Sequence, residues 1–213
     1  MAIDSYSNLK TGIGNWIARS DLTSYLDDFI DNFEARVNYG TGVDAPFPSE
    51  PIRTRNMITS SDLTLSSGAA SLPTDFLEAK RVTAKTSPRI KLEYASPDWL
   101  DEIYPDTTAS DPAFYTILGS SLIVRPVTTS QIELQFYQKL TALSDSNTSN
   151  WLLAATPNGY LYGSLVEAAL FIHDNDMASR WYGLMMGALG GLMRSEIRMA
   201  PTIPSRRASG AVA

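Results

Sequence analysis

The sequence predicts an α+β fold in which a helical bundle, formed by N-terminal helices and a C-terminal helical hairpin, carries a β-rich insert, a small sandwich or barrel. Apolar residues recur with helical spacing near both ends of the chain and alternate with polar residues in the middle. Pro46, Pro48 and Pro51 exclude a continuous helix from the segment 40–51. We therefore expect N-terminal helices over 1–40, the insert over 41–148, the hairpin over 149–198 and an extended tail over 199–213.

Two amphipathic helices are expected before residue 40. Ser7 is a candidate N-cap residue for the first and Asp21 for the second, because short polar side chains accept hydrogen bonds from free helix N–H groups. The apolar face of the first helix consists of Leu9, Ile13, Trp16 and Ile17. That of the second consists of Leu22, Leu26, Phe29, Phe33 and Val37.

The insert is predicted to contain six or seven short strands, as in a small sandwich or barrel. Apolar and polar residues alternate most clearly over 89–94 and 132–136, which is typical of strands with one face in water. Weaker candidates are 53–59, 63–65, 77–84, and a hairpin of 114–118 with 122–125. Ser96 followed by Pro97 predicts a short capped helix that reaches Ile103.

The C-terminal hairpin combines two different helices. The first has two apolar stripes, so we expect it to contact two neighbours. These stripes are Leu161, Leu165, Ala168 and Ile172, and Val166, Leu170 and His173. The second helix follows Asp176 and has an apolar face of Trp181, Leu184, Met185, Ala188 and Leu192.

A row of glycines, Gly183, Gly187 and Gly191, recurs at a spacing of four along the second helix. Each glycine costs about 1 kcal/mol relative to alanine inside a helix, so a close approach of another backbone should offset this cost. One alternative is packing within the subunit against Gly163, Ala168 and Ala169. The other is contact with a neighbouring subunit.

Composition limits the possible functions. The chain has 213 residues, a net charge of −6 and no cysteine, which excludes disulfides and cysteine zinc sites and argues against a protein that wraps nucleic acid over most of its surface. The longest apolar stretch, 181–193, is shorter than the roughly 20 residues that a bilayer requires, so no membrane span is expected. The polar start of the chain predicts no secretion signal.

Candidate catalytic groups have simpler interpretations. His173 with Asp174 and Asp176 could suggest a hydrolytic triad or a calcium loop, but no nucleophile elbow or loop glycine accompanies them, and a turn between helices is favoured. The cluster of Asp98, Asp101 and Glu102 could suggest glycoside chemistry, although the wet face of a short helix is favoured. No phosphate-binding loop occurs. We expect no catalytic activity, cofactor or metal.

The C-terminal end is basic although the chain as a whole is acidic. The segment from Met177 to Ala213 contains five arginines and one acidic residue, Glu196. It could be a solvated tail, a protein-docking tail or a DNA-contacting arm. Aromatic residues are absent after Tyr182, which disfavours stacking on single strands. The candidate partner-binding residues are Arg194, Arg198, Met199, Ile203, Arg206 and Arg207.

Several short motifs, taken in order, resemble the head-to-tail adaptor (connector) proteins of tailed bacteriophages. The C-terminal motif begins with Asn150-Trp151-Leu152-Leu153 and continues through Pro157, Tyr160-Leu161-Tyr162-Gly163, Leu165, Glu167-Ala168 and Asp174. The middle motifs are Leu72-Pro73-Thr74-Asp75-Phe76-Leu77 and Gln135-Phe136-Tyr137-Gln138-Lys139-Leu140. With the helices from Tyr6 to Arg36, the resemblance covers about residues 5–198.

This resemblance implies a structural virion protein at the head–tail interface, assembled in the host cytoplasm. Such proteins form a ring, typically of twelve copies, that joins the portal protein to tail or nozzle proteins, while genomic DNA passes through the lumen without specific binding. The helical part and the C-terminal extension contact the portal. Alternatives are another ring or tail-tube component of a phage particle, a DNA-binding accessory protein that uses the basic tail, or a carbohydrate-active enzyme.

Overall fold

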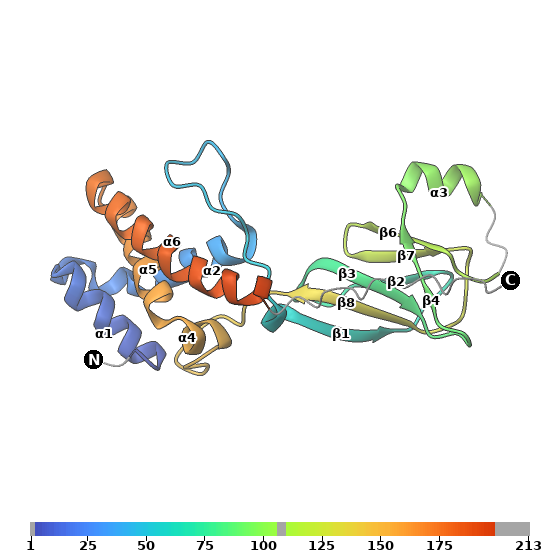
Figure 1. The fold of residues 1–213 in the computed structure, drawn as a ribbon, viewed down its shortest axis with the longest axis horizontal. Coiled ribbons are helices and arrows are strands. Elements are labelled where there is room, and N and C mark those ends of the chain that lie inside the picture. Colours follow the sequence, from blue (N-terminus) through green and yellow to red (C-terminus); the bar gives the residue numbers. More distant parts are fainter. Residues whose placement is uncertain (1–2, 106–109, 199–213) are drawn as a thin grey trace, which may run out of the picture. The chain divides into compact units, whose positions relative to one another are not determined.

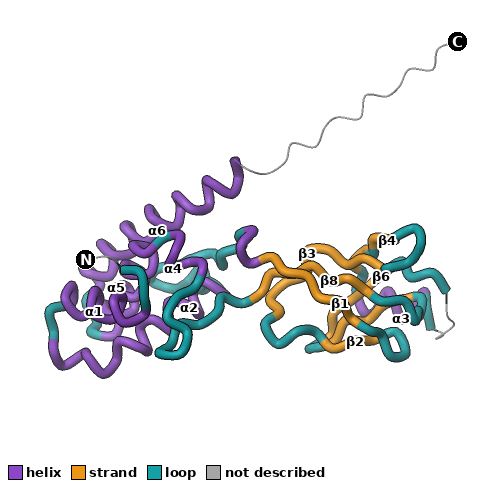
Figure 2. The backbone as a smooth tube through the Cα atoms, turned by 90° about the horizontal axis from the view of Figure 1, so that it is seen from below, coloured by secondary structure: helices purple, strands orange, loops and turns teal. Residues whose placement is uncertain are grey.

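The computed structural model describes residues 3–105 and 110–198 and confirms the α+β class (Figure 1). Figure 2 distinguishes the helices, in purple, from the strands, in orange. The chain divides into a helical unit, Met1–Phe33 with Leu143–Ala213, and a β-rich unit, Glu34–Ala142. The divisions fall at residues 33 and 143, whereas the hydropathy pattern suggests boundaries near 40 and 149. The expected tail, 199–213, lies outside the described residues.

The helical unit contains segments from both ends of the chain. They are α1 (Tyr6–Ile17), the 3₁₀-helix η1 (Ser20–Tyr25), the first part of α2 (Leu26–Tyr39), α4 (Trp151–Ala155), α5 (Pro157–Phe171) and α6 (Asn175–Arg198). Helix α5 contacts α1, α4 and α6. Members of both its apolar stripes, including Leu161, Leu165 and Val166, are buried, which confirms that the helix has more than one neighbour.

Capping residues explain where several of these helices begin. Ser5, not Ser7, caps α1: its Oγ accepts the Asn8 N–H over 3.3 Å. Asp21 does not start an α-helix, because it lies in η1 and pairs with Arg19 over 2.6 Å. Asn150 caps α4, where its Oδ1 accepts the Leu153 N–H over 2.9 Å.

The β-rich unit is a sandwich of two four-stranded sheets. Its strands are β1 (Ile58–Leu63), β2 (Ala69–Ser71), β3 (Phe76–Ala84), β4 (Ile90–Lys91), β5 (Glu93–Tyr94), β6 (Phe114–Leu118), β7 (Ser121–Arg125) and β8 (Ile132–Gln138). The sheets have the orders β1-β8-β3-β4 and β2-β7-β6-β5. Both contribute to one core, for example Leu134 and Phe136 from the first and Leu122 and Val124 from the second.

Three strand expectations in this unit were wrong. Of the segment 63–65, only Leu63 belongs to a strand, as the end of β1. The segment 89–94 is not one strand, because the chain changes sheets at the buried residue Leu92: β4 pairs with β3, whereas β5 pairs in parallel with β6. The segment 53–59 contains a 3₁₀-helix, η2 (Arg55–Met57), and only its end belongs to β1. The short helix α3 (Pro97–Ile103) is confirmed, with Ser96 as its N-cap residue.

Candidate interaction surfaces

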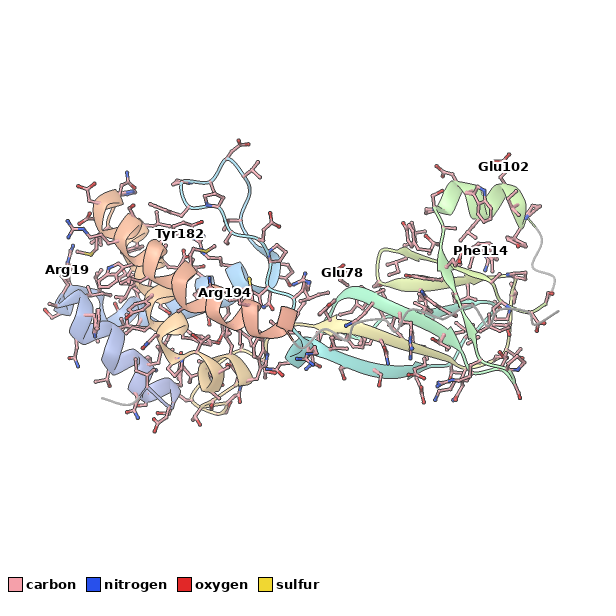
Figure 3. The ribbon with its side chains drawn as sticks, in the orientation of Figure 1. Arg19, Glu78, Glu102, Phe114, Tyr182 and Arg194 are labelled. Atoms are coloured by element: carbon pink, nitrogen blue, oxygen red, sulfur yellow. The ribbon has the colours of Figure 1, made fainter. Side chains whose placement is uncertain are left out.

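The side chains considered for catalysis have structural roles or lie on the surface. His173 is exposed and adopts a left-handed backbone (φ 59°) directly after α5, and Asp174 Oδ1 accepts the Met177 N–H over 2.9 Å. These residues therefore form the turn between α5 and α6. Asp98, Asp101 and Glu102 are exposed on α3 (Glu102 is labelled in Figure 3).

No group of three or more metal-ligating side chains is found within residues 3–105 and 110–198. In the same part of the chain, none of the helices has the length and apolarity that a bilayer span requires.

The glycine row of α6 faces away from the rest of the helical unit. Gly183, Gly187 and Gly191 are exposed, and a Cβ atom built on each would meet no described atom within 4 Å. Met185 and Leu189 are buried instead. Because successive helical residues are about 100° apart, Met185 lies almost opposite Gly183 and Gly187.

The expectation that this glycine row packs within the subunit is therefore wrong for the described chain. Gly163, proposed as one partner of the row, instead faces Phe33, whose ring occupies the space that a Cβ atom would need. Leu184 was assigned to the apolar inner face of α6, but it is 47% exposed. Contact with a neighbouring subunit stays a prediction.

We call the exposed side of α6 the outer face; it comprises Met177, Arg180, Gly183, Leu184, Gly187 and Gly191. The 13 residues between Arg180 and Arg194 carry no charge. Both arginines are exposed, and neither has an ion pair with a side chain of residues 3–105 or 110–194. A long uncharged surface that includes large apolar side chains is typical of a protein-binding site.

The candidate docking residues lie at or beyond the end of this helix. Arg194 lies near the C-terminal end of α6 (Figure 3), and Arg198 is its last residue. Met199, Ile203, Arg206 and Arg207 lie outside the described residues. The structure thus places the start of the basic segment at the end of the helix that carries the outer face.

A second surface of the helical unit is a groove between α2 and α5, which we call the acidic groove. Its volume is about 590 Å³. The lining includes Tyr25, Asp28, Asp31, Glu167, Leu170 and Phe171. Two of these side chains are exposed aromatic rings, Tyr25 at 41% and Phe171 at 49%, and their centroids are 5.0 Å apart.

The carboxylates near this groove are in unequal environments. Hydrogen bonds from Tyr6 and Lys10 lower the pKa of Asp27 despite partial burial. One helical turn further along α2, partial burial raises the pKa of Asp31, and repulsion by Asp27 and Asp28 adds to the effect. Neither Asp28 nor Asp31 has an ion pair within the described part of the chain. A cation in the groove would relieve this repulsion.

Sequence reasoning did not identify the groove, although part of its signal is visible. Tyr25, Asp28 and Asp31 recur at a spacing of three and so share one face of the second predicted helix. Their partner, Phe171, lies 140 positions after Asp31. The contact between these distant segments depends on tertiary packing.

An aromatic cluster joins three helices of the same unit. The Trp16 ring from α1 lies 5.9 Å from Tyr162 of α5 and 5.3 Å from Trp181 of α6, edge-on in both cases. The Tyr162 and Trp181 rings are stacked with centroids 6.0 Å apart. Trp16 remains 50% exposed, so the cluster both stabilises the bundle and presents an aromatic surface.

Comparison with known proteins gives one assignment. The model of a family described as SU10 adaptor protein matches residues 4–208. The match includes segments of both units. No curated protein sequence matches the chain.

Proposed function

This chain belongs to the SU10 adaptor protein family, a family of phage head-to-tail adaptors, and on that premise we propose that it forms a ring joining the portal vertex to the tail. It is a structural phage protein. The family match, which spans 205 of the 213 residues, is the observation that carries the proposal. In the proposed ring, typically of twelve copies, the chain surrounds the DNA channel, binds tail or nozzle proteins and has no catalytic role. Its place is the head–tail interface of the virion, after assembly in the host cytoplasm.

The charge of the chain supports this role. Each subunit carries a net charge of −6, so a ring of many copies carries a large net negative charge, and we propose that its lumen is acidic. Negative walls repel DNA phosphates and let genomic DNA slide without specific binding. The DNA-binding alternative would instead have to rest on the basic C-terminal end alone, because the rest of the chain is acidic.

We propose that the basic end of the chain docks on the portal protein. Arg194 and Arg198 lie on the last turns of α6, directly before Met199 and Ile203. Arg206 and Arg207 add two further positive charges. A segment that combines apolar side chains with flanking arginines suits binding along a groove or sheet edge of another protein.

A binding assay with the portal protein of the same phage tests this assignment. The full chain should co-sediment with portal rings, and a chain truncated after Arg198 should not, while its circular dichroism spectrum stays unchanged. The matched control is Arg19→Ala, which removes a cation of the helical unit that already pairs with Asp21. Equal binding by the truncated chain would contradict the docking role. Strong, salt-dependent binding to duplex DNA without portal binding would favour the accessory-protein alternative.

A further inference from the structure

The acidic groove has the chemistry of a site for an arginine side chain. Asp28 and Asp31 supply negative charge without an ion pair in the described residues. Leu170 and Phe171 belong to the last turn of α5, where the carbonyl end of the helix dipole also favours a cation. The exposed rings of Tyr25 and Phe171 can contact both a guanidinium plane and an alkyl chain.

Arg180 on the outer face of α6 fits these requirements. Two other basic side chains of the helical unit are already paired: Lys10 lies 3.2 Å from Asp27, and Arg19 lies 2.6 Å from Asp21. Arg180 is exposed and has no ion pair in the described chain. It is therefore available to a carboxylate on another molecule.

The neighbours of Arg180 also match the groove. Met177 and Leu184, one turn to either side, are 36% and 47% exposed and can pack on the exposed rings. Gly183 lies beside them with open space above its Cα atom, which permits a close approach of the opposing helix. Arg194 lacks such flanking groups on its N-terminal side, where Gly190 and Gly191 precede it.

We propose that the acidic groove of one copy receives Arg180, Met177 and Leu184 from the outer face of α6 in a second copy. The inference rests on the proposed ring and names the contact that would build it. None of the groove-lining residues belongs to α6, so the groove and the outer face share no side chain. A contact between two different surfaces is heterologous; it adds copies in one direction and can close into a ring.

Disulfide cross-linking tests the contact directly, because the chain contains no cysteine. Asn32→Cys places a thiol at the groove, and Gly183→Cys places one on the outer face. Oxidation of a concentrated mixture of the two variants should give cross-linked dimers, and a chain carrying both substitutions should give a ladder of multimers. The matched control pairs Gly183→Cys with Thr11→Cys, an exposed position on α1. A yield no greater than that of the control would overturn the proposal.

Charge exchange provides a second test. Two charge variants are compared: one carries both Asp28→Arg and Asp31→Arg, and the other carries Arg180→Glu. Each should reduce the cross-linked yield by about tenfold. Mixing the two charge variants should restore the yield, because each then offers a complementary surface to the other. Lack of restoration would overturn the pairing of these groups, whereas thermal melts show whether each variant is folded.

Both cross-linking tests are performed without a portal protein. They therefore separate this contact from the proposed function. Ladders without portal association would retain the contact and contradict the adaptor role.

Discussion

The ring of Phe33 lies directly against the Cα atom of Gly163, where α2 meets α5. It also contacts Tyr160 edge-on, with ring centroids 5.1 Å apart. All three residues are buried. Close approach of an aromatic ring to a helix backbone explains the glycine at position 163, since any side chain there would overlap the ring.

Gly163→Ala should therefore destabilise the protein even though alanine favours helices. The overlap with Phe33 should cost on the order of 1–3 kcal/mol of unfolding free energy, measured by urea denaturation. Phe33→Leu shortens the opposing side chain, so the double variant should lose less than the sum of the single variants. Strict additivity would show that the two residues do not constrain each other.

The opposite result is expected on the outer face of α6. Gly187→Ala should raise the free energy of unfolding of the monomer by up to about 1 kcal/mol, because alanine is the better helix former and meets no described atom within 4 Å. Gly183→Ala should behave in the same way. Destabilisation would reveal an intramolecular contact at these positions.

If the glycine row contacts a neighbouring subunit, a larger side chain there should separate stability from assembly. Gly187→Leu should leave the thermal unfolding midpoint of the monomer unchanged or raise it. In a chain that also carries Asn32→Cys and Gly183→Cys, it should reduce the yield of disulfide-linked multimers. Glu102→Leu, an exposed substitution on α3, is the control. Full retention of the ladder would remove Gly187 from the contact.

Two carboxylates one turn apart on α2 should respond to pH with opposite signs. Asp27 has a lowered pKa, so its ionised form adds stability above the reference value of 3.8, and this stability is lost as pH falls through the folded pKa. Asp31 has a raised pKa, so its ionisation removes stability as pH rises above 3.8. Asp27→Asn should destabilise and Asp31→Asn stabilise the protein at pH 7, each by less than about 1 kcal/mol.

Denaturation curves at pH 7 and near pH 3 measure these effects. At the lower pH the gain from Asp31→Asn should disappear, since Asp31 is then protonated in both the folded and unfolded states. The same sign for both variants at pH 7 would contradict the assignment of opposite environments.

In the β-rich unit, a buried hydrogen bond joins residues 102 positions apart. The Asn38 Oδ1 atom accepts the Leu140 N–H over 2.8 Å, and both residues are less than 10% exposed. Asn38→Leu should leave the N–H without an acceptor and cost about 1–3 kcal/mol of unfolding free energy. Asn38→Asp keeps an acceptor oxygen but buries a carboxyl group, so it should cost less than Asn38→Leu when both are measured near pH 3, where that carboxyl is protonated. Equal losses there would show that packing, not the hydrogen bond, matters here.

Periodicity predicted the regular elements well because each is controlled by neighbouring residues. The helices of the hairpin and the strand at Ile132, Leu134 and Phe136 follow patterns that need no distant partner to be recognised. Leu92 shows the limit of this reasoning. It continues the alternation of 89–94, yet its burial marks the point where the chain passes between sheets.

The interaction surfaces were only partly predictable for the same reason. Spacing identified the glycine row, but the direction in which it faces depends on the rotation of α6 against α5, which buries Met185 and Leu189. The acidic groove combines Asp28 with Phe171, and no local pattern relates these two positions. The family resemblance supplied a function that composition alone could not supply.

The most direct test of the adaptor role is electron microscopy of the purified full-length chain mixed with the portal protein of the same phage. We predict an additional ring stacked coaxially on one end of the portal, with density for many copies of this chain around an open channel. Portal particles that remain bare at saturating concentrations of the folded chain would contradict the adaptor role.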